Sequence, residues 1–411
     1  MKRILPMLVL LGTFWMVFRP TVAQTVSPEA MRPKSAIPDQ FRSLYQELDE
    51  TLRQQRELYP FKNGRTCPMV SPGLFMAGSG FGPAAPDSQR WQDLVATLDA
   101  FKTLGMNAVS VMIAAPDLSL SDPKPLIGFY QRLAAAIHSR GMKLYIEHFD
   151  NPPFSPHAHK GYPDTQQGKQ DFLRMRKNEL TLIYRNIKPD YLSLITEPET
   201  MARWSHLSFS TDELTNWVGE VAKSLKHTEH NPNILLGAGA GIWEGEDFVL
   251  KAARQPDLDY MDIHFFALKL NGRDMVATLA DRIHKVRQMR PQMKITIGET
   301  WLYKHGADEP GGMLNRDAYF RDNFSFWSPL DGDFLKLMLG IARKENISVV
   351  APYFSQYFFT YYTFGDADSN RPPPWPGSIL WSWNKSMESI RNQALSPTGE
   401  AVRTTLRGCS N

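Results

Sequence analysis

Cysteine and net charge are both scarce in this chain. Cys67 and Cys409 are the only two cysteines among 411 residues, so the chain can form at most one internal disulfide. Basic residues exceed acidic residues by only 3, and the sequence contains no low-complexity tract. With 42% hydrophobic and 22% charged residues, the composition is that of an ordinary globular protein and excludes a disordered or fibrous chain.

The N-terminus carries a long apolar run. Two basic residues open the chain, an apolar stretch covers residues 4–18, and small residues follow up to Ala23. This order is typical of a signal peptide, so residues 1–23 are predicted to be removed and the protein to be secreted or periplasmic. A membrane anchor is the alternative, but Pro6 and Arg19 leave an apolar run too short to cross a bilayer comfortably.

Removal of this segment would leave no net charge. It contains Lys2, Arg3 and Arg19 and no acidic residue, and 46 Lys and Arg less these three equal the 43 Asp and Glu. The balance gives no reason to expect nucleic acid as a partner, or a membrane after cleavage. No cysteine follows the apolar run, which argues against a lipid-anchored form.

The next part, residues 24–66, is predicted to hold a linker and one helix. Residues 24–37 are rich in Pro, Ser and Thr, as linkers are. From Asp39 to Leu58 apolar residues recur at helical spacing, at Phe41, Leu44, Tyr45, Leu48 and Leu52. We expect this amphipathic helix to pack outside the main domain, with a partner-binding role as the alternative.

Residues 67–411 alternate short apolar runs with amphipathic stretches. Eight strands are predicted, over residues 69–77, 107–114, 143–148, 191–196, 234–240, 260–265, 294–300 and 348–355. Helices are predicted around residues 88–104, 125–140, 167–187, 211–227, 244–255, 274–290, 333–345 and 386–406. This alternation requires a parallel sheet, because each crossover returns the chain to the same end.

Eight such units predict an α/β fold of the (β/α)8 TIM-barrel type, with long loops after strands 7 and 8. A doubly wound open sheet is the alternative, but Pro83 and Pro86 interrupt the turn after the first strand, where a dinucleotide-binding fold opens a helix.

In a barrel, strands begin and helices end at the same face. Cys67 precedes the first strand and Cys409 follows the last helix, so the two are predicted to form a disulfide at that face.

The active site of such a barrel lies at the C-terminal ends of the strands. Two apolar strands there each deliver a glutamate, Glu197 in Leu-Ser-Leu-Ile-Thr-Glu-Pro and Glu299 in Ile-Thr-Ile-Gly-Glu-Thr-Trp. A carboxylate pair suits glycosidic cleavage, in which one group protonates the leaving oxygen and the other attacks or stabilises the developing cation. Strands 4 and 7 lie across the mouth from each other, which could bring the two groups about 5 Å apart.

On these motifs residues 68–406 resemble glycoside hydrolase clan A, the retaining (β/α)8 enzymes that include cellulases, mannanases and galactanases. In that clan the acid/base glutamate ends strand 4, usually in Asn-Glu-Pro, and the nucleophile ends strand 7. The resemblance implies that Glu197 is the acid/base and Glu299 the nucleophile. It also matches His264 to the clan's histidine on strand 6 and His148 to the one on strand 3.

The chain also departs from the clan pattern. Thr196 replaces the usual asparagine, Phe266 replaces a tyrosine that often binds the nucleophile, and neither an arginine on strand 2 nor a tryptophan on strand 8 is evident. A threonine hydroxyl can donate one hydrogen bond but lacks the second donor of an amide. These departures leave open a barrel that binds saccharides without cleaving them.

The predicted substrate is an oligosaccharide or polysaccharide with β linkages, and no cofactor is predicted. Its contacts are predicted at the strand ends and on aromatic side chains that can stack on sugar rings, at His148, Asp150, Thr196, His264, Trp301, Tyr353 and Tyr357. No metal is predicted. A metal-dependent hydrolase using His148, His157, His159 or His264 is the remaining alternative. The sugar, the linkage and the oligomeric state are not predicted.

Overall fold

The computed structural model describes residues 36–62, 64, 67–79, 88–119, 122–150, 161–229, 231–306, 309, 316–365 and 377–409. The predicted signal peptide lies outside this part, as do His157 and His159. Within the described residues, none of the helices combines the length and the apolar character needed to cross a membrane.

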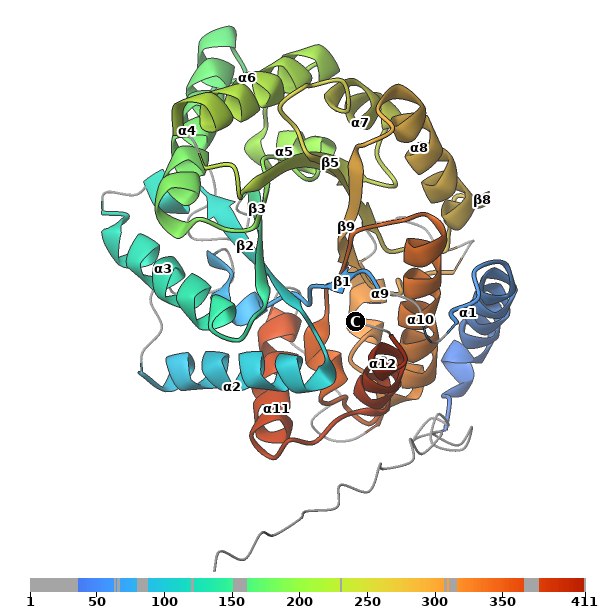
Figure 1. Ribbon diagram of the computed structural model, residues 1–411. Helices are drawn as coiled ribbons and strands as arrows, with labels where there is room; N and C mark the ends of the chain where they lie inside the picture. The colour runs from blue at the N-terminus through green and yellow to red at the C-terminus, as the bar shows by residue number, and fades with distance from the viewer. Residues whose placement is uncertain are drawn as a thin grey trace, which may run out of the picture.

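Eight parallel strands form one sheet in the order β1-β10-β9-β6-β5-β4-β3-β2. A parallel bridge between Gly73 and Ser110 joins the two edges and closes the sheet into the barrel seen in Figure 1. The strands are β1 (Met69–Val70), β2 (Ala108–Ala115), β3 (Lys143–Asp150), β4 (Tyr191–Ser193), β5 (Leu235–Gly241), β6 (Tyr260–Phe265), β9 (Lys294–Thr300) and β10 (Val349–Pro352). A separate hairpin pairs β7 (Lys269–Leu270) with β8 (Arg273–Asp274).

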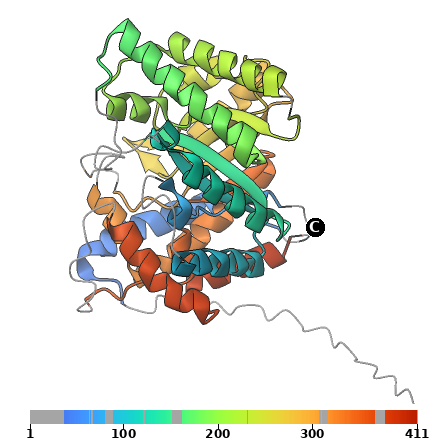
Figure 2. The ribbon, with the colours of Figure 1, turned by 90° about the vertical axis from the view of Figure 1, so that its left-hand side faces the viewer.

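Helices surround the barrel (Figures 1 and 2). They are α1 (Asp39–Leu58), α2 (Ser88–Leu104), α3 (Lys124–His138), α4 (Gln166–Leu182), α5 (Pro198–Ser205), α6 (Thr211–Glu229), α7 (Glu246–Ala252), α8 (Met275–Met289), α9 (Arg316–Arg321), α10 (Ser328–Lys344), α11 (Gly377–Arg391) and α12 (Pro397–Arg407). The predicted (β/α)8 barrel is confirmed.

The differences from the prediction concern individual elements. The last predicted helix is wrong as a single element, because the chain forms α11 and α12 with a break between them. Ser396 makes that break, since its side chain accepts a hydrogen bond from the amide of Gly399 and so caps the start of α12. The short helices α5 and α9 follow β4 and β9 and were not predicted.

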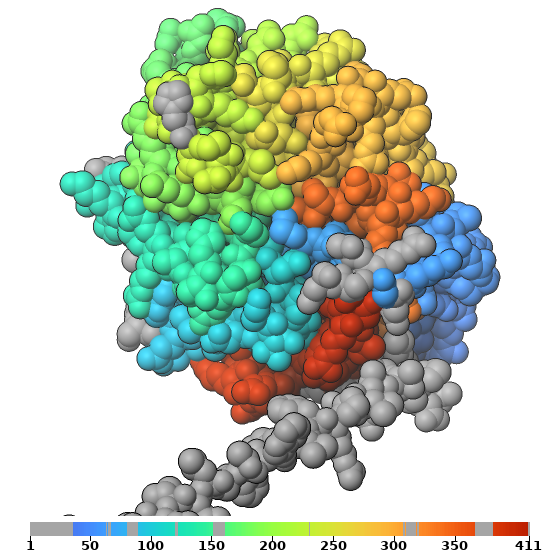
Figure 3. All heavy atoms as spheres, viewed as in Figure 1, coloured from blue at the N-terminus to red at the C-terminus, as the bar shows by residue number. Residues whose placement is uncertain are grey.

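The end of the barrel where the strands begin is filled by aromatic side chains. Tyr145, Tyr191 and Tyr260 pack together inside this end, with ring centroids 5.5–5.9 Å apart. The hydroxyl groups of Tyr145 and Tyr260 each lie 3.0 Å from Oγ of Ser193, which satisfies these buried polar atoms. Figure 3, which views the face that carries the C-terminus, shows no opening there. The packed tyrosines therefore close this end of the barrel interior.

Helix α1 packs outside the barrel beside α10, as the sequence predicts (Figure 1). Its buried positions include Leu48 and Leu52. Arg56 makes an ion pair with Asp333 of α10 at 2.6 Å.

The predicted disulfide between Cys67 and Cys409 is present, with a Cα to Cα distance of 5.6 Å. It joins residues 342 positions apart, so it ties the segment before β1 to the end of α12. The bridge therefore links the two ends of the barrel domain.

We expect replacement of both cysteines by serine to lower the free energy of unfolding by roughly 2–4 kcal/mol, because the unfolded chain regains the entropy that this long loop removes. Urea denaturation of both proteins measures the difference. A reducing agent should lower the stability of the parent protein and leave the double variant unchanged. Equal stability of the two proteins without reductant would contradict a stabilising role for the bridge.

Candidate active site

Glu197 stands where β4 gives way to α5. Pro198 begins that helix, so Glu197 occupies its N-cap position, and the Glu197 side chain is 20% exposed. Glu244, in the loop after β5, fixes the start of this helix through hydrogen bonds to its backbone. One carboxyl oxygen of Glu244 accepts hydrogen bonds from the backbone amides of Glu199 and Thr200, and the other accepts one from Gly241. The backbone that carries Glu197 is therefore held by a buried carboxyl group.

A β-bulge directs Glu299 into the barrel. Thr296 faces the interior, where its hydroxyl donates to Asp262, and strict alternation from there would turn Glu299 outward. The register of β9 against both neighbouring strands shifts by one residue before Thr300, so β9 holds one extra residue at this point. Such bulges are common beside active sites, where they reorient a side chain. Here the bulge turns Glu299 towards the mouth.

The bulge depends on a glycine. The amide of Gly298 donates to Oδ1 of Asp262 at 2.8 Å. A Cβ atom at position 298 would lie 2.5 Å from both carboxyl oxygens of Asp262, closer than such contacts occur. Only glycine fits here without moving Asp262.

His264 lies between the two predicted catalytic glutamates. Its Nδ1 is 2.8 Å from Oε1 of Glu197 and 3.5 Å from Oε2 of Glu299. The distance between these two oxygens cannot exceed the sum of those values, which is below the roughly 6.5 Å at which the carboxyl separations of inverting enzymes begin. The two carboxyl groups therefore share one nitrogen of His264.

Two further carboxyl groups face the other nitrogen of His264. Its Nε2 is 3.8 Å from Oε2 of Glu147 and 3.8 Å from Oδ2 of Asp262. Asp262 also accepts hydrogen bonds from Ser193 and Thr296, both at 2.9 Å. The imidazole is thus surrounded by four acidic side chains, from β3, β6, β9 and the N-cap of α5.

These neighbours control the protonation of the site. Burial works against a charge on His264, but Glu299, Asp262, Glu197 and Glu147 together raise its pKa well above the ordinary value. Burial also favours the neutral form of Asp262, yet its hydrogen bonds and His264 hold its pKa below the ordinary value. Asp262 and His264 therefore form a buried, ionised pair beneath the two glutamates.

Glu299 and Glu147 shift the opposite way from Asp262. Burial raises the pKa of Glu299 to about 7, although the charge of His264 counteracts the rise. Burial, and then repulsion from Glu299, raise the pKa of Glu147 well above its ordinary value. Burial, and then the charge of Glu197, raise the pKa of Glu244 to about 8.

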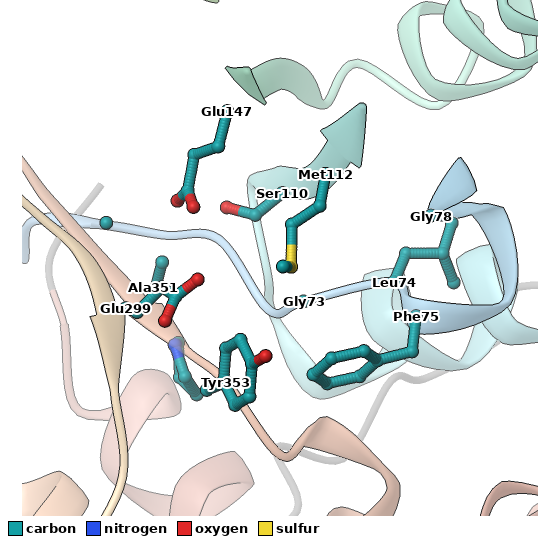
Figure 4. A pocket seen from close by; sticks show the side chains of 12 residues that line it. Gly73, Leu74, Phe75, Gly78, Ser110, Met112, Glu147, Glu299, Ala351 and Tyr353 are labelled. Atoms are coloured by element: carbon teal, nitrogen blue, oxygen red, sulfur yellow. The ribbon is translucent and has the colours of Figure 1, made fainter. Parts of the chain in front are cut away.

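A pocket enclosing about 300 Å³, including space open to solvent, adjoins these groups. Figure 4 shows the carboxyl groups of Glu147 and Glu299 directed towards the same space, with Met112, Tyr353 and Phe75 around it. Tyr353, a predicted substrate contact, thus lies beside the predicted nucleophile. The pocket combines acidic groups with an apolar wall.

Three other predicted substrate contacts lie in different surroundings. His148 is fully buried, with Nε2 3.0 Å from Glu179 of α4. Asp150 pairs with Arg176 of the same helix at 2.7 Å. The period of two along β3 explains this, because His148 and Asp150 share one face of the strand while Glu147 has the other. Thr196 is buried immediately before Glu197 and is not among the residues that line this pocket.

Trp301 and Tyr357 are buried together outside the pocket. Their ring centroids are 5.8 Å apart, and Trp301 also packs on Phe354 and Phe358. The hydroxyl of Tyr357 donates to Asn323 at 3.0 Å. Both side chains therefore hold the segments after β9 and β10 together, and the structure does not place them as sugar platforms.

The structure adds three acidic residues to the site that the predicted set lacks: Glu147, Asp262 and Glu244. Glu147 and Asp262 lie within β3 and β6, and the alternation of these strands could have indicated their inward direction. Glu147, His264 and Glu299 each offer one possible ligand atom, and these atoms lie within 4.8 Å of one another. Such a set of oxygen and nitrogen donors could hold a divalent metal ion.

No protein-family model matches this chain, and no curated protein matches it in sequence. Similar folds are found among solved structures. A GH5_18 protein of Bifidobacterium longum subsp. infantis is 14% identical with a TM-score of 0.54, over 83% of this chain and 79% of that chain. A variant of a GH5_18 protein from B. longum subsp. longum, in complex with Manβ1-4GlcNAc, is 13% identical with a TM-score of 0.50, over 83% and 78%.

An exo-β-1,4-mannosidase from an Opitutaceae bacterium is 14% identical with a TM-score of 0.49, and this chain covers 61% of its length with 85% of its own. Identities this low establish the fold alone. The chain therefore has a (β/α)8 barrel similar to those of solved glycoside hydrolases.

The raised pKa of Glu299 makes stability depend on pH. The folded protein binds this proton more tightly than the unfolded chain does, so the free energy of unfolding should fall as pH rises from about 4.5 to about 7. We expect Glu299→Gln to reduce this fall and to be more stable than the parent at pH 7, by on the order of 1–3 kcal/mol.

Urea denaturation at several pH values measures this effect. Glu220→Gln, which changes an exposed carboxylate on α6, serves as the control and should follow the parent curve. Parallel curves for Glu299→Gln and the parent would show that Glu299 titrates alike in the folded and unfolded states.

Proposed function

We propose that this protein is a retaining glycoside hydrolase that cleaves a β-linked glycan, with Glu197 as the acid/base and Glu299 as the nucleophile. The observation that carries the proposal is the placement of both carboxyl groups around one nitrogen of His264, at 2.8 and 3.5 Å. The pair stands at the strand ends of a (β/α)8 barrel, where such barrels carry their chemistry.

In the first step, Glu299 attacks the anomeric carbon while Glu197 gives its proton to the departing glycosidic oxygen. The carbon–oxygen bond to the leaving sugar breaks, and an ester between the glycosyl unit and Glu299 forms. In the second step, Glu197 takes a proton from water, whose oxygen attacks the same carbon and releases Glu299. Two inversions at one carbon retain the β configuration.

Other side chains around the two glutamates support this chemistry. His264 holds the two carboxyl groups in one place and offsets the negative charge of Glu299. Tyr353 and Phe75 offer an aromatic wall beside the nucleophile, which suits the apolar face of a sugar ring.

Export to an oxidising compartment is also part of the proposal, supported by the N-terminal sequence and by the disulfide.

The test uses the purified protein on a panel of β-linked glucosides, mannosides and their oligosaccharides. We expect Glu197→Ala and Glu299→Ala each to lower kcat by about 100-fold to 10,000-fold on any substrate that the parent cleaves. Glu220→Ala is the matched control and should retain full activity. Folded Glu197→Ala and Glu299→Ala proteins with parental activity would overturn the assignment.

Azide distinguishes the two roles. Added azide should restore turnover of an activated aryl glycoside by Glu299→Ala and release a glycosyl azide of inverted configuration, because the small anion replaces the missing nucleophile. With Glu197→Ala, the released glycosyl azide should keep the β configuration. The reverse pattern would exchange the roles of the two glutamates.

A further inference from the structure

We propose that Glu244 is a positioning residue that caps helix α5 in place of Glu197, and so leaves the Glu197 carboxyl group free to reach the active site. This inference rests on the proposed function. It deepens that function by explaining how a glutamate at the N-cap of a helix can serve as the acid/base.

Helix α5 begins at a residue with two competing uses. The first amides of a helix have no partner within the helix, so a side-chain acceptor at the N-cap commonly binds the amides of the second and third residues. Glu197 occupies the N-cap of α5, yet its side chain makes no capping hydrogen bond to the described residues of this helix. One of its carboxyl oxygens instead lies 2.8 Å from Nδ1 of His264.

Helix α8 of the same chain shows the common arrangement. Asp274 is its N-cap residue, and Oδ1 of Asp274 accepts hydrogen bonds from the amides of Val276 and Ala277, at 2.9 and 3.0 Å. These are the second and third residues of α8. The comparison identifies the two hydrogen bonds that a carboxylate at the N-cap of α5 would be expected to make.

Glu244 makes both of these bonds in α5. Its Oε1 accepts the amide of Glu199 at 3.0 Å and that of Thr200 at 3.2 Å, and these are the second and third residues of the helix. The first residue, Pro198, has no amide hydrogen to offer. The acceptor that this helix needs is therefore supplied from another loop, and Glu197 is released from the task.

Glu244 is itself held firmly in the loop after β5. Its other carboxyl oxygen accepts the amide of Gly241 at 3.0 Å. Arg282 of α8, only 4% exposed, donates to the backbone oxygens of Gly241 and Glu244 at 3.1 and 2.9 Å. Glu199 returns a bond to the same loop, because its carboxyl group accepts the amide of Gly245 at 3.0 Å. The two loops therefore clasp each other through their backbones.

The loop after β5 also contacts the group that receives Glu197. The amide of Ile242 donates to the backbone oxygen of His264 at 2.9 Å. Glu244 and His264 therefore act on Glu197 from connected backbone segments, Glu244 at the helix that follows it and His264 at its carboxyl group. This connection fixes where the Glu197 carboxyl group lies relative to the mouth of the barrel.

Loss of the Glu244 carboxyl group would reverse the arrangement. The amides of Glu199 and Thr200 would lose their acceptor, and the positive end of the helix dipole attracts a carboxylate. Glu197 stands at the position from which a side chain reaches these amides. Its carboxyl group would turn towards the helix and away from His264, so the departing oxygen would receive its proton less readily.

Four substitutions test this role. Glu244→Met has a similar length and offers no oxygen, whereas Glu244→Gln keeps an amide oxygen that can accept. Glu244→Asp keeps the charge but is one carbon shorter, and it carries the same expectations as Glu244→Met if the methionine variant does not fold. Asp274→Ala removes the cap of α8 and is the matched control, because it leaves the loop after β5 intact.

The leaving group provides a readout that a general loss of packing would not change selectively. A departing sugar needs the proton of Glu197, whereas 2,4-dinitrophenolate leaves without one. On a β-linked oligosaccharide that the parent cleaves, we expect Glu244→Met to lose roughly 10-fold to 100-fold in kcat/KM, part of what a general acid contributes. On the 2,4-dinitrophenyl glycoside of the same sugar, the loss should stay within about 3-fold.

The other variants define what would contradict the inference. Glu244→Gln and Asp274→Ala should stay within about 3-fold of the parent on both substrates, since each keeps an acceptor at the start of α5. Equal losses of Glu244→Met on both substrates would indicate a structural role alone. Parental kcat/KM of this variant on both substrates, or the same selective loss in Asp274→Ala, would also overturn the inference.

Crystal structures of the parent and Glu244→Met separate this inference from the proposed function. In the variant, the Glu197 carboxyl group should leave Nδ1 of His264 and accept the amide of Glu199 or Thr200. If it stays on His264, the inference fails even in a protein that cleaves glycans. If it moves to the helix but the parent cleaves no glycan, the proposed function fails while the capping role of Glu244 stands.

Discussion

The charge on His264 is the interaction on which the rest of the site depends. An isolated cation would be costly in the barrel interior, and so would four carboxyl groups in contact with no cation. Together their charges offset one another, with Asp262 and Glu147 on one side of the ring and Glu197 and Glu299 on the other. Removal of His264 would leave the glutamates without their common partner, which explains why one buried imidazole can set the spacing of the pair.

The backbone supports this charge cluster through two local features. Asp262 accepts the amide of Gly298 and so stabilises the bulge that turns Glu299 inward. Glu244 accepts the first amides of α5 and so fixes the chain beside Glu197. Each of the two proposed catalytic glutamates is thus held through its backbone by a second acidic residue, in addition to the contact of its carboxyl group with His264.

Much of this arrangement could be predicted from the sequence. The strand-helix alternation predicts the barrel, and the rule that chemistry lies at strand ends selects Glu197, His264 and Glu299. The period of two along β3 separates His148 and Asp150, which face α4, from Glu147, which faces the pocket. The bulge in β9 could not be predicted, because it depends on Asp262, a residue 36 positions before Gly298 that only folding brings beside it. Trp301 and Tyr357 likewise are buried by segments distant in sequence.

The configuration of the first product is the most direct test of double displacement, which needs the carboxyl groups of Glu197 and Glu299 held close together. Proton NMR during hydrolysis of a β-linked substrate distinguishes the two anomers before they equilibrate. Double displacement predicts that the β anomer appears first. An α anomer as the first product would show that water attacks directly, and it would contradict the role of Glu299 as the nucleophile.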